Sequence, residues 1–504
     1  MTNKRNLLSA DQYFWLFALV ILSLRMGLLY NSPFDLFYDE AQYWGWSKSF
    51  EFGYYSKPPV VAWMIGLTTG ICSDETWCVR LSSPILHIIT SWAIFSLTKL
   101  VFEEKIALLS SVTYLTLPAV TISSMFVSTD PALLCFWALS LWAFIAALKD
   151  DKWRYWILAG IFSGLGMMSK YNMLIFLVSV CSFCFFIPQY RKVFISKKFW
   201  SAILIAAVIF VPNIWWNWQN DFASFLHTQD NAKGEGMSIS LPNMLEFIAS
   251  QNGVFGPILF ISLLIILFLT ATRRIQLDKA QKMLLCFFLP MFLLITSISL
   301  TSRAHANWAA PAYISAVILV VSVLYNSKFC KLIYVSLILH LLILAIISAF
   351  YPLIDSLGLK LYGRKTQISE NIIKDPFRRL MGWEQLGQKV SQIKAQYPEA
   401  GILTYTRKTH AELLYYVRPH PQIIVKWNPQ ERLTDHYDMT GNLNEYEGKD
   451  FLFVTQYDLD VLKDIPLYFQ SSRLIDEVVV DLYPDFKRHY YIFMLKGFRG
   501  YGTK

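Results

Sequence analysis

Long apolar runs, each close to the length of a membrane-crossing helix, follow one another through the first 350 residues. A helix needs about 20 mainly apolar residues to cross a bilayer, so the pattern predicts about eleven spans. They lie near residues 12–30, 81–102, 106–127, 131–148, 154–169, 171–188, 199–216, 254–271, 283–300, 308–325 and 331–350. No small-residue cleavage site follows the first run, which predicts a retained anchor.

Two longer segments interrupt this pattern. Residues 31–80 contain an apolar stretch at 58–71 that is too short to cross a bilayer and is typical of an interfacial or re-entrant helix. Residues 217–252 follow a group of tryptophans, and such rings favour a headgroup boundary. We therefore expect periplasmic juxtamembrane helices in these loops.

The composition changes after Tyr351-Pro352 to that of a soluble domain. Helical periodicity at 383–396 and 410–417 alternates with strand-like runs at 401–406, 422–427, 450–456, 477–482 and 489–495. The sequence thus predicts a polytopic α-helical membrane protein that carries a C-terminal soluble α/β domain. The predicted parts are a membrane module over 1–350, which includes the 31–80 loop, and a domain over 351–504.

Composition supports lipid as the solvent. Of 504 residues, 55% are hydrophobic and only 16% are charged, and the mean hydropathy is +0.39, which excludes a cytosolic multidomain enzyme. The net charge of +9 comes from short basic clusters between the apolar runs, a pattern that sets membrane orientation, and nucleic acid is not expected as a partner. The Lys/Arg bias predicts a cytoplasmic N-terminus and a periplasmic C-terminal domain.

Charged residues near membrane level are costly and are usually functional. In the predicted topology, seven such residues fall on the outer side and favour a polar cavity that opens outward: Asp39, Glu40, Lys57, Asp130, Lys170, Arg303 and His305.

Each of these residues also has a simpler interpretation. Asp39 and Glu40 can stabilise the positive end of a short helix, or one carboxylate can act on an acceptor hydroxyl or on a sugar carbon. Lys57, held extended before two prolines, suits a phosphate, although an interfacial lysine can also snorkel. Ser128-Thr129-Asp130-Pro131 forms an ordinary helix start.

The remaining candidates lie in turns. Lys170 and Arg303 are either interface anchors or part of a cage for a phosphate headgroup. His305 gives little reason to expect a metal, and no metal site is predicted. Cys72 and Cys78 lie outside the predicted spans, where an oxidising periplasm permits a bridge. Walker, Rossmann and His-Glu-x-x-His motifs do not occur in the sequence, so nucleotide-driven chemistry is not expected.

Two stretches carry a resemblance to a known family: Tyr38-Asp39-Glu40-Ala41-Gln42-Tyr43-Trp44 and Gly53-Tyr54-Tyr55-Ser56-Lys57-Pro58-Pro59. They closely resemble the first periplasmic loop of bacterial polyprenyl-phosphate-sugar glycosyltransferases of the GT-C class. The likeness continues in Ser128-Thr129-Asp130-Pro131, Gly164-Leu-Gly-Met-Met-Ser-Lys170-Tyr171, Arg303-Ala-His-Ala-Asn307-Trp308 and Asp375-Pro-Phe-Arg-Arg-Leu-Met-Gly382-Trp383. It therefore spans nearly the whole chain.

The resemblance implies an inner-membrane enzyme that moves a sugar from undecaprenyl phosphate to an outer-leaflet acceptor, with lipid A or lipopolysaccharide core favoured. It implies Asp39 at the reaction centre with Glu40 as helper or structural partner, and Lys57 at the donor phosphate. The implied pocket also holds Tyr55, Lys170 and Arg303, and the implied cavity lining is Tyr43, Asp130, Tyr171 and His305. No cofactor is implied with certainty. A protein O-glycosyltransferase, a lipid-sugar transporter and a catalytically silent scaffold stay as alternatives.

Overall fold

The chain forms two compact units, and each draws on separate stretches of sequence. The computed structural model describes residues 8–233, 239–357, 360–362, 372–458, 462–483 and 486–502. The first unit comprises Met1–Asn31, Glu51–Gly53 and Lys57–Ser348, and the second comprises Ser32–Phe50, Tyr54–Ser56 and Ala349–Lys504. The structure thus divides the predicted 31–80 loop between the two units.

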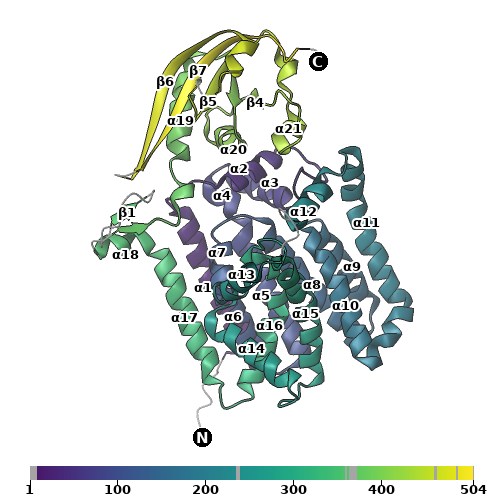
Figure 1. Cartoon of the computed structure of the whole chain (residues 1–504). Helices are drawn as coiled ribbons and strands as arrows, with labels where there is room; N and C mark the ends of the chain where they lie inside the picture. Colours follow the sequence, from purple (N-terminus) through teal and green to yellow (C-terminus); the bar gives the residue numbers. More distant parts are fainter. Residues whose placement is uncertain are drawn as a thin grey trace. The chain divides into compact units, whose positions relative to one another are not determined.

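The first unit is a bundle of helices (Figure 1). Its α-helices are α1 (Ala10–Tyr30), α3 (Val60–Cys72), α4 (Thr76–Arg80), α5 (Ser82–Val101), α6 (Glu104–Thr116), α7 (Pro118–Ser123), α8 (Thr129–Asp150), α9 (Trp153–Met167), α10 (Leu174–Phe186), α11 (Lys197–Gln219), α12 (Ala223–Lys233), α13 (Leu241–Phe255), α14 (Pro257–Ala271), α15 (Lys279–Ser299), α16 (Ala312–Tyr325) and α17 (Lys331–Ser348). The 3-10 helices η1 (Tyr171–Met173), η2 (Pro188–Ile195) and η3 (Ala306–Ala309) connect some of them.

Length and composition confirm a membrane-embedded protein. Among the described residues, six helical stretches are long and apolar enough to cross a bilayer, and further apolar helices of 10–17 residues accompany them. The predicted number of eleven crossings stays a prediction.

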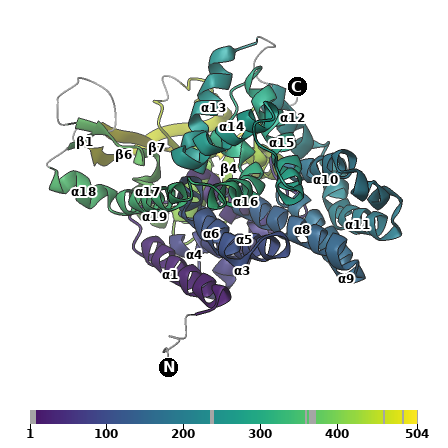
Figure 2. The ribbon, with the colours of Figure 1, turned by 90° about the horizontal axis from the view of Figure 1, so that it is seen from below.

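Burial separates central from peripheral helices in this bundle. Helices α8 and α16 are apolar on nearly all sides and almost fully buried, as expected for helices surrounded by others. In Figure 2 they lie towards the middle of the bundle, while α9 and α11 lie at one edge. On α11, Leu204, Val208 and Val211 are exposed, an apolar outer surface that suits lipid.

One predicted span is wrong as a single helix. Residues 106–127 form α6 and α7, which are separated at Leu117, where ψ is 139°. Pro118 opens α7, and proline both lacks a backbone N–H and pushes the preceding residue out of the helical region. The break therefore follows directly from the sequence.

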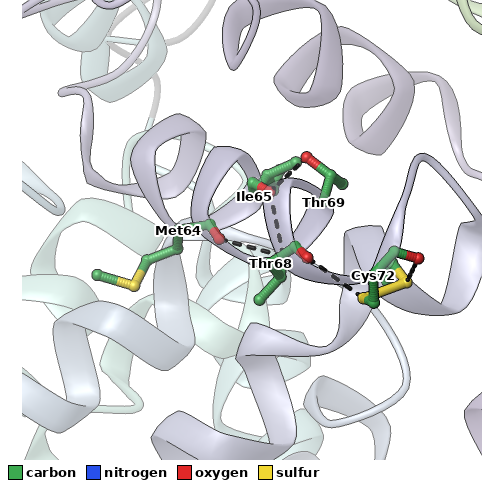
Figure 3. The surroundings of a disulfide bond; sticks show 6 residues. Met64, Ile65, Thr68, Thr69 and Cys72 are labelled. Atoms are coloured by element: carbon green, nitrogen blue, oxygen red, sulfur yellow. Dashed lines mark hydrogen bonds between the residues drawn. A yellow bond between two sulfur atoms is a disulfide. The ribbon is translucent and has the colours of Figure 1, made fainter.

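A disulfide closes the segment after α3. Cys72, the last residue of α3, is bonded to Cys78 in α4 (Figure 3). Just before it, the Thr68 hydroxyl donates to the Met64 and Ile65 carbonyls at 3.1 Å, and Thr69 donates to Ile65 at 2.9 Å. The two threonine hydroxyls of this short apolar helix are thus satisfied within the helix itself.

The second unit is an α/β domain joined by part of the first loop. It contains α2 (Tyr38–Trp46), α18 (Phe350–Ser356), η4 (Arg378–Leu380), α19 (Trp383–Gln396), α20 (Arg407–Tyr416), α21 (His436–Thr440), η5 (Leu443–Tyr446) and η6 (Ile465–Tyr468). Its strands are β1 (Lys360–Tyr362), β2 (Ile372–Lys374), β3 (Gly401–Thr404), β4 (Ile424–Lys426), β5 (Phe451–Thr455), β6 (Phe469–Tyr483) and β7 (Phe486–Phe498).

Five of these strands form one mixed sheet in the order β4-β3-β5-β7-β6. Strand β3 pairs in parallel with β4 and β5, while β7 pairs antiparallel with β5 and β6. Every residue of β3 and β5 is buried, which is typical of strands covered on both faces. The predicted α/β character of this region is confirmed.

A buried ion cluster ties β4 to the segment that follows it. The Lys426 ammonium lies 2.5 Å from Asp435 and 2.7 Å from Asp438, and all three side chains are at most 10% exposed. Buried charges of this kind are tolerated because each one has a partner.

Helix α2 packs against α20 within the second unit. The rings of Trp44 and Tyr415 meet edge-on with centroids 4.9 Å apart, and the Tyr416 hydroxyl accepts from the Leu36 N–H at 2.7 Å. A Cβ at Gly45 would lie 2.9 Å from a methyl group of Leu414, so glycine permits this close approach. These contacts fix the first-loop helix on the C-terminal domain.

Candidate active site

Glu40 caps the helix that carries it. Phe37 is the N-cap of α2, and its backbone N–H donates to the Glu40 carboxylate at 2.9 Å. Only 2% of Glu40 is exposed. This contact supports the role of structural partner, one of the two roles that the resemblance implies for Glu40. A direct role of Glu40 in catalysis stays a prediction.

Asp39, the next residue towards the N-terminus, is paired with a cation from the C-terminal domain. Its Oδ1 lies 3.0 Å from Nη2 of Arg407, the first residue of α20, and both side chains are about one-third exposed. The other terminal nitrogen of Arg407 donates to the Gln42 side chain at 2.8 Å. Asp39 and Gln42 are three residues apart and share one face of α2, so a single guanidinium spans both.

The ring of Tyr38 lies against the cations at this ion pair. The Arg407 guanidinium lies 4.9 Å from the ring centre of Tyr38, and the Lys408 ammonium lies 5.2 Å from it. Burial, together with the adjacent Asp39 charge, raises the pKa of Tyr38. Burial alone would lower the pKa of Arg407, but Asp39 and Tyr38 outweigh it and raise that pKa. Both groups are therefore protonated at neutral pH.

Two further predicted residues lie in the second unit. Tyr43 is buried on α2, with its ring 5.0 Å from that of Trp46. The Tyr54 ring stacks on that of Trp46 with centroids 4.6 Å apart and anchors the short 54–56 segment, in which Tyr55 is half-buried.

The first unit holds a separate polar cluster. Lys170 Nζ lies 2.6 Å from Asp130 Oδ1, and the two side chains are only 15% and 14% exposed. The Asn307 side chain donates to Asp130 Oδ2 at 2.5 Å. Ser128 caps α8 by accepting from the Asp130 N–H at 3.3 Å. The predicted helix start at Ser128 is therefore present. The Asp130 carboxylate takes no part in that cap and instead contacts Lys170 and Asn307.

Lys57 belongs to the same neighbourhood. Its charge acts on Asp130, and three residues later the Val60 N–H donates to the Met168 carbonyl at 3.1 Å, just before Lys170. The structure thus brings Lys57, Asp130 and Lys170 together. The predicted roles of the two lysines at the donor phosphate and of Asp130 in a cavity lining stay predictions. With two lysines and one aspartate, this Lys57–Asp130–Lys170 cluster carries net positive charge.

Tyr171 extends the polar surface in another direction. Its hydroxyl lies 2.6 Å from Ser224 and donates to Asn213 at 3.2 Å. It therefore links the turn before α10 to α11 and α12.

Arg303 and His305 have other surroundings. The Arg303 guanidinium is 78% exposed and lies 2.9 Å from Glu246 of α13, so the structure pairs it with a carboxylate outside the lysine cluster. His305 is exposed and faces the ring of Trp308 at 5.5 Å. Their roles at a phosphate or in a cavity stay predictions.

Two cavities of the first unit lie near predicted site residues. One of about 60 Å³ has a mainly apolar lining that includes the side chains of His87, Tyr114, Asp130, Asn307 and Tyr313, so the carboxylate of the lysine cluster borders a small cavity. The other, of about 400 Å³, lies between α8, α9, α10 and α11 and has an almost wholly apolar lining. It is suited to apolar groups only.

Sequence reasoning missed Arg407, Asn307 and Glu246 as partners of the predicted residues. Asn307 lies inside the quoted Arg303–Trp308 motif, so the resemblance pointed near it. Arg407 lies far along the chain, in a domain that was not expected to contact the stretch Tyr38–Trp44 (the Asp39 motif). Among the described residues, no three His, Cys, Asp or Glu side chains are placed to hold a metal ion.

Known proteins share both the sequence and the fold. The family described as dolichyl-phosphate-mannose-protein mannosyltransferase matches residues 56–216. The lipid A galacturonosyltransferase RgtD of Rhizobium johnstonii is 33% identical over 395 residues, which cover 78% of this chain and 80% of that protein. This chain is a GT-C glycosyltransferase. The expectation from the first-loop motif is confirmed, and the protein is an enzyme.

Other relatives of this GT-C glycosyltransferase are more distant. The lipopolysaccharide core galacturonosyltransferase RgtA of the same organism is 25% identical over 36% of this chain and 37% of its own. The crystal structure of ArnT from Cupriavidus metallidurans in the apo state is 14% identical and has a TM-score of 0.59, covering 96% of this chain and 98% of that one. The crystal structure of the same protein bound to undecaprenyl phosphate has a TM-score of 0.58. The fold is shared over nearly the full length.

Proposed function

We propose that this GT-C glycosyltransferase transfers a hexuronic acid of the galacturonic type from a polyprenyl phosphate to lipid A. The observation that carries the proposal is the 33% identity, over 78% of this chain, to a protein named for transfer of that sugar to lipid A. Two further relatives are named as galacturonosyltransferases of the lipopolysaccharide core. The likeness in fold to a protein crystallised with undecaprenyl phosphate supports a lipid-linked donor.

The reaction takes place at the periplasmic face of the inner membrane in this proposal. The Cys72–Cys78 disulfide supports that orientation for the segment after α3, because disulfides persist in oxidising compartments. The Lys/Arg bias of the loops supports the same side.

The Lys57–Asp130–Lys170 cluster is the proposed site for the donor phosphate. Its net positive charge favours an anion, and the low exposure of Lys170 and Asp130 strengthens electrostatic contacts there. In the reaction the bond between the anomeric carbon and the phosphate oxygen breaks, and the electron pair leaves with the phosphate. Lysine ammonium groups stabilise the charge that develops on that leaving group.

Asp39 is the proposed acidic residue of the reaction. The acceptor oxygen forms the new bond to the anomeric carbon on the face opposite the departing phosphate, which inverts the configuration. If the acceptor is a hydroxyl, the Asp39 carboxylate takes its proton. If the acceptor is a phosphate of lipid A, no proton has to leave, and Asp39 acts through its charge and by positioning the acceptor.

A purified preparation tests the donor site. The full chain is reconstituted in liposomes with lipid A and with polyprenyl phosphates that carry a hexuronic acid, a neutral hexose or an aminopentose. We expect transfer from the hexuronic acid donor, and we expect Lys57→Ala to lower kcat/KM for it by about 100-fold, since a charge-assisted contact to the phosphate is lost. Lys105→Ala, at an exposed position on α6, serves as the matched control.

Two results would contradict the proposal. Equal use of the three donors would remove the assignment of the sugar. Unchanged kcat/KM in Lys57→Ala would remove the phosphate role of the lysine cluster.

A further inference from the structure

The C-terminal part of the chain contributes a residue to the Asp39 motif. Helix α2 and helix α20 belong to the same unit, although the Asp39 motif lies in the first loop and Arg407 lies in the C-terminal domain (Figure 1). The Arg407 guanidinium reaches Asp39 with one terminal nitrogen at 3.0 Å and Gln42 with the other at 2.8 Å.

The position of Arg407 on its own helix is electrostatically unfavourable. Arg407 and Lys408 open α20, after the Thr406 cap, and the first turn of that helix contains no acidic residue. Cations at a helix N-terminus oppose the helix dipole, where carboxylates are normally preferred. The Asp39 carboxylate supplies the missing negative charge from another element.

The ion pair is not needed to hold the two helices together. The Trp44–Tyr415 ring contact and the Leu36–Tyr416 hydrogen bond already join α2 to α20. Because Asp39 and Arg407 are about one-third exposed, their pairing contributes little to stability. What it does determine is where the Asp39 carboxylate points.

We propose that Arg407 is a positioning residue that orients the Asp39 carboxylate for glycosyl transfer. The inference rests on the proposed role of Asp39. The guanidinium fork contacts two side chains on one face of α2, so it restricts rotation of Asp39 in a way that a lysine ammonium cannot. The C-terminal domain thereby becomes part of the machinery of transfer.

The test compares Arg407→Met and Arg407→Lys with wild type in the full chain reconstituted in liposomes. Arg407→Met keeps the length of the side chain and removes the charge and the fork, and we expect kcat to fall by at least about tenfold with KM for the donor within about twofold. Arg407→Lys restores the charge only, and we expect part of the kcat to return. Arg473→Met, at an exposed position on β6, is the control.

The split between kcat and KM separates positioning from structure. A misoriented Asp39 carboxylate slows transfer in the bound complex, so kcat per folded enzyme should fall while KM for the donor stays close to that of wild type. Loss of a structural contact alone would lower the amount of folded enzyme and leave kcat per folded enzyme unchanged.

Failure of this inference differs from failure of the proposed function. If Asp39→Asn retains full transfer, the proposed role of Asp39 is wrong. If Asp39→Asn is inactive while Arg407→Met keeps the kcat of wild type, the role of Arg407 is overturned and that of Asp39 stands. Should Arg407→Met not fold, Arg407→Lys decides the matter, because a wild-type kcat in that variant would refute the need for the fork.

Discussion

The Lys170–Asp130 pair gives a quantitative prediction about the membrane unit. At 2.6 Å the two charges attract each other by about 6 kcal/mol with an effective dielectric constant of 20, and the cost of removing both from water offsets most of this. Removal of one partner of a buried pair costs about 3–5 kcal/mol, because the other charge stays buried alone. We therefore expect Asp130→Asn to destabilise the unit by about that amount.

The surroundings predict an asymmetry between the two single variants. After Asp130→Asn, Lys170 stays buried close to the positive charge of Lys57. After Lys170→Met, the Asp130 carboxylate keeps its hydrogen bond from Asn307 and the attraction of Lys57. Lys170→Met should therefore cost less than Asp130→Asn, and the double variant should cost about 2 kcal/mol less than the sum of the two.

The assay is reversible unfolding of the full chain in mixed micelles, followed by tryptophan fluorescence. The pair Lys198–Asp151 is a matched control, with a similar distance of 2.8 Å but an Asp151 side chain that is 76% exposed. Its double-variant coupling should be much smaller than that of the Lys170–Asp130 pair, because solvent screens the exposed Asp151 charge. Additive costs at Lys170 and Asp130, or a coupling no larger than that of the control pair, would refute the reasoning.

Three further predictions concern stability elsewhere in the chain. Burial holds the pKa of His410 and of His436 at about 3, so the folded state binds fewer protons than the unfolded state between about pH 6.5 and 3. Stability should fall as the pH drops through that window, by about 2 kcal/mol for each histidine at pH 5, seen as smaller hydrogen-exchange protection factors in α20 and α21 at pH 5 than at pH 7. Lys426→Met should cost the second unit about 3–5 kcal/mol in a denaturant titration, because two buried aspartates lose their cation. Replacement of Cys72 and Cys78 by serine should cost about 2 kcal/mol for a loop this short, measured by thermal unfolding of the full chain.

Each of these predictions has a clear contrary result. Protection factors in α20 and α21 that are the same at pH 7 and pH 5 would contradict the buried neutral histidines. A cost of Lys426→Met no greater than that of Lys487→Met, whose ion pair with Asp481 is exposed, would contradict the buried cluster. Equal unfolding temperatures of the serine variant and wild type would contradict a bridge.

Local pattern predicts local structure well in this chain. The helix at 383–396 is found with the same bounds as α19, because one face of it is apolar and the other polar. The long strand β6 begins at Phe469, earlier than predicted, because its first half is exposed and polar and lies at the edge of the sheet. The pattern of the sequence does not show which strands pair. Pairing with β7 extends β6 back to Phe469.

The candidate site shows the same difference between what local pattern predicts and what only the fold reveals. Asp39, Lys57, Asp130 and Lys170 stand out because each is a charge placed beside apolar runs. Their partners do not stand out, since Arg407 resembles any surface arginine until the fold places it against α2. The one local sign was a cation at the start of a helix, where an acidic residue is the usual choice.

Mass spectrometry of lipopolysaccharide tests the central claim most directly. Lipid A and core are compared from cells that lack the gene, cells in which it is restored, and cells restored with Asp39→Asn. The account predicts that one hexuronic acid is lost from lipid A on deletion, returns with the intact protein and does not return with Asp39→Asn. A lipid A spectrum that is unchanged by deletion would contradict it.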